Sequence, residues 1–162
     1  MRAFDLVREW PANNTSICII DRRGDAHTFG DTARASRIAS ISKLITAWAT
    51  LIAVEDGSTS FDAQVGQQEC TLAHLLSHAG GYSFDGAVPI VTPGRKRIYS
   101  NTGYELIADH VEQVSEISFT DFLHEAIFEP LGMPKSFLKS NVGWPPRPAV
   151  PGWPQARAQK PG

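Results

Sequence analysis

The sequence predicts an α+β fold in which one β-hairpin is combined with a set of helices. Residues 15–21 are rich in β-branched side chains, and a Gly-containing turn leads from them to a second extended segment over residues 26–30. A long segment from residue 41 repeats its apolar side chains at i, i+3, i+4 and i+7, which is the helical spacing. These two patterns differ in period, so strands and helices are both expected.

A short helix is predicted over residues 3–9 and ends before Pro11. The hairpin segment follows it. Residues 22–25 form the expected turn, in which glycine allows a positive φ. Cys18 lies in the apolar run Ile17-Cys18-Ile19-Ile20 of the first predicted strand, and we expect it to be a buried, unreactive thiol.

Four helices are expected after the hairpin. The first begins near Ser40 and ends at Glu55-Asp56-Gly57, and the second covers residues 71–78 before Gly80-Gly81. Residues 82–98 carry prolines and glycines and are expected to form a loop. The third helix starts near Asn101, and the fourth starts at the cap-like Ser118 and ends before Pro130.

Composition limits the classes of function. The chain has 162 residues, which suits one domain or a piece of a larger one, and 42% of them are hydrophobic. A net charge of −2 gives no overall basic field for nucleic acid, and the basic run at residues 95–97 is interpreted as a solvated loop. Two cysteines do not make a disulfide framework, and the scattered histidines suggest no metal site.

Targeting signals are not visible in the sequence. The first ten residues lack the basic, apolar and small-residue order of a signal peptide, and the longest apolar run, residues 47–54, is too short to span a bilayer. The expectation is therefore a soluble cytoplasmic protein without membrane partners.

Ser40 and Lys43 form the most informative pair in the chain. A serine and a lysine three residues apart at the start of a helix lie on one face, one turn from each other. A serine nucleophile paired with a lysine base needs this arrangement, and burial can lower the pKa of a lysine toward neutrality. The simpler interpretation is a helix N-cap beside a solvated lysine. A second such spacing, Ser136 to Lys139, follows Pro134 in a predicted loop and has no helix to carry it.

Tyr99 and Asn101 flank the start of the third helix. A phenol near a lysine can accept or relay the serine proton, because the cation favours the phenolate. The Asn101 amide offers a donor and an acceptor, suited to a substrate carbonyl or to Lys43. The alternatives are a half-buried aromatic for Tyr99 and a helix cap for Asn101.

Four segments resemble the class C β-lactamase and penicillin-binding-protein-like serine hydrolases, a family that includes D,D-peptidases and esterases. They occur in the family's order between residues 15 and 136: Arg37–Lys43 is similar to its FRIASVSK-type segment, Thr71–Gly81 to TLRHLLTHTSG, Arg97–Tyr104 to its YSN motif, and Phe128–Met133 to FxPLGM.

The resemblance implies a role for each candidate residue. Ser40 is the expected acylated nucleophile, Lys43 its activating base partner, Tyr99 the proton carrier, and Asn101 a contact to the substrate amide. The implied substrate is a small amide, ester or β-lactam, and the mechanism calls for no metal or organic cofactor. His78 is interpreted as structural, because the family's chemistry uses Ser, Lys and Tyr.

The chain departs from this family in its last part. The resemblance implies a late strand with Lys- or His-x-Gly that completes the oxyanion hole, and nothing convincing fills that place; Lys160-Pro161-Gly162 has the spelling but not a strand's composition. The fold expected is thus a β-lactamase/D,D-peptidase-like α+β fold, with a hairpin and a helical subdomain but without the central C-terminal strands.

The predicted domains are a partial serine β-lactamase-like domain over residues 1–139 and a Pro-rich, disordered tail over residues 140–162. An out-of-frame ending after Lys139 is one hypothesis for that tail. Three functional hypotheses stay open: an enzyme that is acylated on Ser40, a non-catalytic fragment, and a half-enzyme completed by another chain. An exposed strand edge offers a surface for a partner or for self-association.

Overall fold

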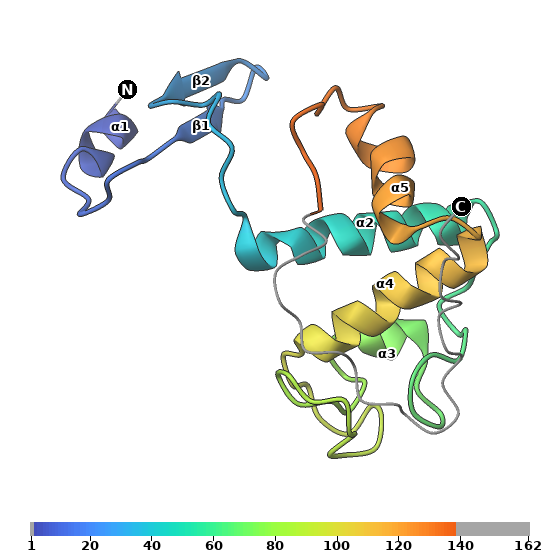
Figure 1. The fold of residues 1–162 in the computed structure, drawn as a ribbon. Helices are drawn as coiled ribbons and strands as arrows, with labels where there is room; N and C mark the ends of the chain where they lie inside the picture. Colours follow the sequence, from blue (N-terminus) through green and yellow to red (C-terminus); the bar gives the residue numbers. More distant parts are fainter. Residues whose placement is uncertain (1, 139–162) are drawn as a thin grey trace, which may run out of the picture. The chain divides into compact units, whose positions relative to one another are not determined.

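The computed structural model of the chain describes residues 2–138, with side chains from residue 4 onward (Figure 1). The chain divides into two compact units, Met1–Arg37 and Ile38–Gly162, and each is considered by itself. Helices and a small antiparallel sheet together confirm the predicted α+β class. The predicted tail, residues 140–162, lies outside the described residues.

The first unit contains helix α1 (Arg2–Val7) and the strands β1 (Ile17–Ile20) and β2 (Ala26–Phe29). The strands pair antiparallel, with Ile17 opposite Phe29 and Ile20 opposite Ala26. The turn between them is held by the Asp21 carboxylate, which accepts the backbone N–H groups of Arg23 and Asp25. The predicted hairpin is therefore present, with shorter strands.

Cys18 is exposed, so the expected buried thiol is wrong. Along β1, Ile17 and Ile19 are half-buried, whereas Cys18 and Ile20 are exposed. Side chains of a strand alternate between its two faces, and only one face of this hairpin is packed within its unit. An apolar run therefore does not bury every residue in it.

The second unit is helical. A 3₁₀ turn, η1 (Ala39–Ile41), leads into α2 (Ser42–Glu55), and α3 (Leu72–Leu76) and α4 (Asn101–Ser115) follow. Then α5 (Phe119–Leu123) continues directly into one π-helical turn, η2 (His124–Phe128). In Figure 1, α4 packs between α2 and α3, while α5 lies against α2. All four predicted helices are found, although the fourth changes from α to π geometry in its second half.

The core of the helical unit draws on every helix in it. It is filled by small residues of α2, by α3, and by larger side chains of α4 and the α5–η2 segment, namely Ala49, Ala53, Leu72, Leu75, Leu106, Ile107, Val111, Phe119, Phe122, Leu123, Ile127 and Phe128. Ala49 and Ala53 have no exposed surface, which allows the neighbouring helices to approach α2 closely.

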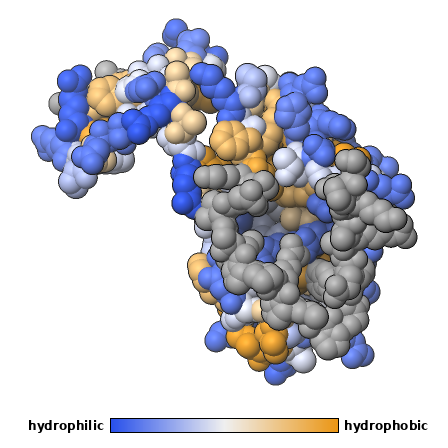
Figure 2. Space-filling view, viewed as in Figure 1, coloured by the Kyte–Doolittle hydropathy of each residue, from blue (hydrophilic) through white to orange (hydrophobic). Residues whose placement is uncertain are grey.

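A second face of α2 is apolar but exposed. Ile41, Leu44, Trp48 and Leu51 follow helical spacing and keep 60%, 71%, 48% and 49% of their surface accessible. We call these four residues the outer row of α2. Apolar side chains reach the surface of the helical unit in Figure 2. The helix is therefore apolar on more than the face that it buries.

Within residues 2–138, the only sheet is the two-stranded hairpin. No helix in this part of the chain is both long and apolar enough to cross a bilayer. The Lys160-Pro161-Gly162 segment lies outside the described residues.

Candidate active site

Ser40 and Lys43 lie at the entry to α2, as their spacing predicts, but Ser40 is not the helix cap. It occupies the middle of the 3₁₀ turn η1, and the N-cap of α2 is Ile41, with no side-chain capping hydrogen bond. The residue before it, Ala39, has a φ of +46°, an unusual conformation for a residue with a Cβ. The simple N-cap interpretation of Ser40 is therefore wrong, and its hydroxyl is left for other contacts.

Lys43 is half-buried and bonds to the start of α4. Its Nζ donates to Asn101 Oδ1 at 2.6 Å, joining residues 58 positions apart in the sequence. The packing of α2 against α4 makes this contact possible. An amine held at one fixed oxygen loses rotamer freedom in advance, which favours a defined position over a solvated one.

Asn101 is free to meet Lys43 because its neighbour performs the capping. Ser100 is the N-cap of α4, and its Oγ accepts the N–H of Gly103 at 3.0 Å. The other end of the Asn101 amide donates from Nδ2 to Asp85 Oδ1 at 2.8 Å. Two opposite partners orient the amide, with its oxygen toward Lys43 and its nitrogen toward Asp85.

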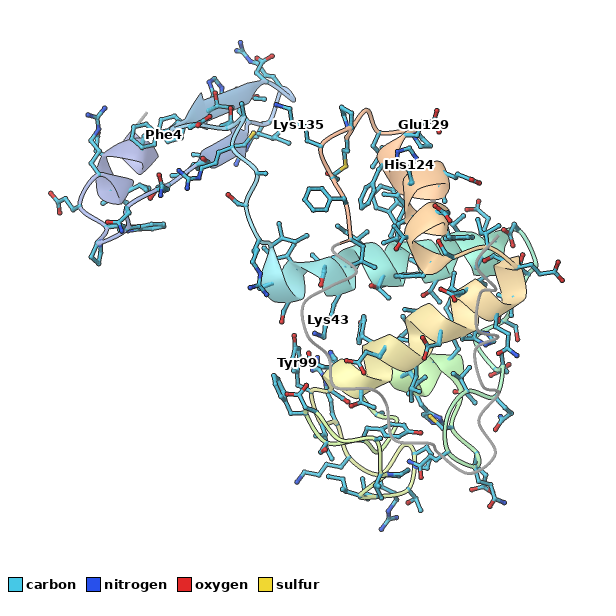
Figure 3. The ribbon with its side chains drawn as sticks, viewed as in Figure 1. Phe4, Lys43, Tyr99, His124, Glu129 and Lys135 are labelled. Carbon is cyan, nitrogen blue, oxygen red and sulfur yellow. The ribbon has the colours of Figure 1, made fainter. Side chains whose placement is uncertain are left out.

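Tyr99 completes the cluster from the loop before α4. The Lys43 Nζ lies 4.9 Å from the centroid of its ring, and Figure 3 shows Lys43 projecting from α2 toward the start of α4, where Tyr99 lies. A side-chain hydrogen bond with Ser40 lowers the pKa of Tyr99, a hydrogen bond to Lys43 and the charge of Lys43 lower it further, and partial desolvation opposes them. The phenol is 43% exposed, so it is accessible from solvent.

The four predicted residues are thus brought together within one unit. Hydrogen bonds and ring contacts connect Ser40, Tyr99, Lys43 and Asn101 in that order. Of the second serine–lysine spacing, Ser136 follows η2 and Lys139 lies outside the described residues. The arrangement brings an alcohol, an amine and a phenol together, and these are the functional groups that nucleophilic attack with proton transfer requires.

Sequence reasoning missed two neighbours of the site. Asp85 lies in the predicted loop 82–98, and no local pattern marks it as the partner of Asn101. Tyr104 lies at the end of the segment similar to the YSN motif and was given no role, but its ring centroid lies 5.7 Å from Lys43 Nζ. Its position five residues after Tyr99, one helical turn into α4, was the one available signal.

His78 also contacts the site. Its ring lies 4.5 Å from Tyr99 and 5.0 Å from Tyr104, measured between centroids. Among the described residues, no group of three or more His, Cys, Asp or Glu side chains is arranged to hold a metal ion.

The fold is that of the β-lactamases and penicillin-binding proteins. Residues 31–161 match the family described as Beta-lactamase, and the chain belongs to that family. The family is that of the β-lactamases and the related penicillin-binding proteins. The matched region also includes most of the segment predicted as a tail.

Individual relatives agree with this assignment. Penicillin-binding protein 4* of Bacillus subtilis is 29% identical over 59% of this chain and 29% of its own length. A β-lactamase structure from Mycobacterium bovis is 36% identical, with a TM-score of 0.79 over 82% of this chain and 48% of that one. A penicillin-binding protein from Bacillus halodurans shares the fold at 21% identity and a TM-score of 0.71, covering 90% of this chain and 58% of that one. The chain thus spans less than half the length of the first two relatives.

Proposed function

We propose that this chain acts as a serine hydrolase that forms an acyl-enzyme on Ser40. The observation that carries the proposal is the position of the Lys43 amine, which lies 2.6 Å from Asn101 Oδ1 and 4.9 Å from the centroid of the Tyr99 ring. Tyr99 is in turn hydrogen-bonded to Ser40. Each group needed to activate a hydroxyl lies within the helical unit.

In acylation, Ser40 Oγ attacks the carbonyl carbon of the substrate and forms a new C–O bond. The hydroxyl proton passes to Tyr99, whose lowered pKa favours the phenolate, with the Lys43 ammonium stabilising that negative charge. The bond from the carbonyl carbon to the leaving nitrogen or oxygen then breaks, and the leaving group takes up the proton. Lys43 is thus the activating partner and Tyr99 the proton carrier.

In deacylation, a water molecule repeats the attack on the ester of Ser40. Its proton goes to the same Tyr99–Lys43 pair, the bond to Ser40 Oγ breaks, and the serine recovers a proton. Asn101 is proposed to contact the substrate amide while its oxygen holds Lys43. The proposed reaction steps use no metal or organic cofactor.

The proposed substrate is a small molecule with an activated carbonyl: a β-lactam, a D-Ala-D-Ala-like peptide or a simple ester. The three classes share the acylation step and differ in the leaving group. They are separated by giving the protein one substrate of each class and measuring turnover.

The test is covalent labelling of the full chain. A fluorescent penicillin and a fluorophosphonate are incubated with the protein, and the modified peptide is identified by mass spectrometry. We expect an adduct on Ser40 that is lost in Ser40→Ala. Ser136→Ala is the matched control, because it removes the serine of the second serine–lysine spacing and should label normally. Labelling that persists in Ser40→Ala would overturn the proposal.

A second candidate is a half-enzyme that needs a further polypeptide to supply strands and a Lys- or His-x-Gly segment. The exposed outer row of α2 favours it, since four large apolar side chains in one line are a surface that a partner can cover. We infer that such a partner would add the second oxyanion donor, whose loss typically reduces turnover by about 10²–10³.

Native mass spectrometry and a thermal melt distinguish these candidates. The half-enzyme predicts self-association, or slow labelling that increases when the partner polypeptide is added. A cooperative monomer that turns over substrate unaided contradicts it. A folded monomer that no probe labels would instead indicate the third hypothesis, a non-catalytic fragment.

A further inference from the structure

We propose that His78 is a positioning residue that holds Tyr99 in place over Lys43 and beside Ser40. This inference rests on the proposed function, because the position of Tyr99 matters for activity only if the phenol carries a proton. The contacts on which the proposal rests are with the two tyrosine rings and the backbone beside Tyr99, so His78 is not assigned a catalytic role.

The first observation is that His78 binds the backbone on both sides of Tyr99. The carbonyl of His78 accepts the N–H of Ile98 at 2.8 Å, and its ring Nδ1 accepts the N–H of Ser100 at 3.1 Å. One residue therefore binds the backbone N–H of the residue before Tyr99 and that of the residue after it. A loop residue anchored in this way loses most of its backbone freedom.

The second observation is that the His78 ring packs on the phenol. Its centroid is 4.5 Å from that of Tyr99, with the planes 35° apart, and 5.0 Å from that of Tyr104. The Lys43 Nζ lies over the same two phenol rings. The imidazole, the two phenols and the amine thus form one packed group, in which a shift of His78 moves Tyr99 relative to Lys43.

The protonation state of His78 fits this role. An Nδ1 that accepts a hydrogen bond carries no proton, so the ring is neutral with its proton on Nε2. Burial lowers the pKa of His78, and the positive charges of Lys43 and Arg97 lower it further. The titratable side chains that face the ring are thus Tyr99, Tyr104, Lys43 and Arg97.

The backbone at His78 dictates the variants for the test. Its φ of +60° lies in the left-handed region, which Gly and Asn adopt more readily than other residues. His78→Gly keeps this conformation but removes the ring and the acceptor. His78→Asn keeps the conformation and an oxygen that can accept the Ser100 N–H, but it removes the aromatic face. The difference between the two variants measures the acceptor, and the loss left in His78→Asn measures the ring.

The experiment measures two quantities in the full-length chain. One is the rate constant of Ser40 labelling by fluorescent penicillin at saturating probe, together with the half-saturating concentration. The other is the titration of Tyr99, followed by the ultraviolet absorbance of phenolate. Tyr99 is the first of the three tyrosines to titrate, because its pKa is lowered while burial raises those of Tyr82 and Tyr104. Tyr99→Phe removes that step and so assigns it.

We expect His78→Gly to reduce the labelling rate constant by about 10- to 100-fold, the scale on which small misplacements of a reacting group act. The half-saturating concentration should change little, and the pKa of Tyr99 should rise toward its ordinary value as its bonds to Ser40 and Lys43 loosen. His78→Asn should lie between His78→Gly and the wild type in both measurements.

His74→Ala is the matched control. His74 lies in α3, where its ring accepts the Thr71 N–H in a capping box, whereas the ring that packs on Tyr99 is that of His78. This variant should lower the melting temperature without moving the Tyr99 titration. A Tyr99 titration that is unchanged in His78→Gly, or that shifts equally in His74→Ala, would overturn the inference. If the wild type fails to label, the proposed function fails, but the titration still tests His78.

Discussion

The two compact units of this chain bury apolar surface to very different extents. In Met1–Arg37, Val7 is the single buried hydrophobic residue among those with described side chains, and the hairpin presents alternate side chains to solvent. In the described part of the second unit, each of α2, α3, α4, α5 and η2 contributes to a continuous core, and all four candidate site residues belong to this unit. The comparison teaches that the candidate site residues belong to the unit with the continuous core.

The largest effect is expected for Tyr99→Phe, which removes the proposed proton carrier but keeps the ring. The rate of Ser40 labelling should fall by about 10²–10⁴, the usual range for general acid–base catalysis. Because the pKa of Tyr99 is lowered, the wild-type rate should rise with pH as the phenol ionises below its ordinary value, and the variant should lose this rise. Labelling rates measured across pH provide the test.

The hairpin offers the control for that measurement. His27 lies in β2 and pairs with Asp21, so it belongs to the other unit. His27→Ala should leave the labelling rate and its pH profile unchanged. A change as large as that of Tyr99→Phe would show that the hairpin unit takes part in the site, which would break the comparison.

Stability should follow the same division. Leu75 of α3 is 1% exposed and lies in the helical core, so Leu75→Ala should reduce the free energy of unfolding by about 2–5 kcal/mol. Ile20 of β1 is 70% exposed, and Ile20→Ala should change the free energy of unfolding by less than about 0.5 kcal/mol. Urea unfolding compares the two variants directly. Equal losses would mean that Ile20 is covered in the folded protein.

A smaller effect is expected at Asp85, which orients Asn101. Asp85→Ala removes an exposed hydrogen bond of about 1 kcal/mol, so labelling should slow about fivefold. Asp85→Asn keeps an accepting oxygen and should recover most of the rate. Asp25→Ala, a carboxylate lost from the hairpin turn, should have no effect. If Asp85→Asn were as slow as Asp85→Ala, the carboxylate charge and not the hydrogen bond would be responsible.

The smallest effect is expected in the outer row of α2, which resembles the hairpin in its exposure. Leu44 is 71% exposed, and Leu44→Glu should change the free energy of unfolding of the isolated chain by no more than about 0.5 kcal/mol. Ala53→Glu, on the buried face of the same helix, should prevent folding. A large loss for Leu44→Glu, seen together with a loss of self-association, would sharpen the case for a partner on this face.

Much of the fold could be predicted because its signals are local. The apolar spacing of α2, the threonine that caps α3 and the serine that caps α5 all act within a few residues. Helix existence and order were therefore correct. The π turn after α5 was not foreseen, since an extra residue per turn leaves no mark in an apolar pattern.

Exposure was harder to predict than element type. Cys18 and the outer row of α2 are apolar in sequence but exposed in the structure. Hydrophobicity indicates that a side chain gains from burial, but only packing decides whether a neighbour is present to bury it.

For the site, the sequence alone determined which residues are the candidates. The spacing of Ser40 and Lys43 and the motif at Tyr99 and Asn101 are recognisable because local chemistry and family resemblance both mark them. The tertiary structure decided the rest. It made Ser100 the cap and so released Asn101 for Lys43, and it brought Asp85 and His78 to the cluster. Those contacts join positions distant in the chain, and their formation depends on the packing of α2 and α3 against α4, which no short sequence window contains.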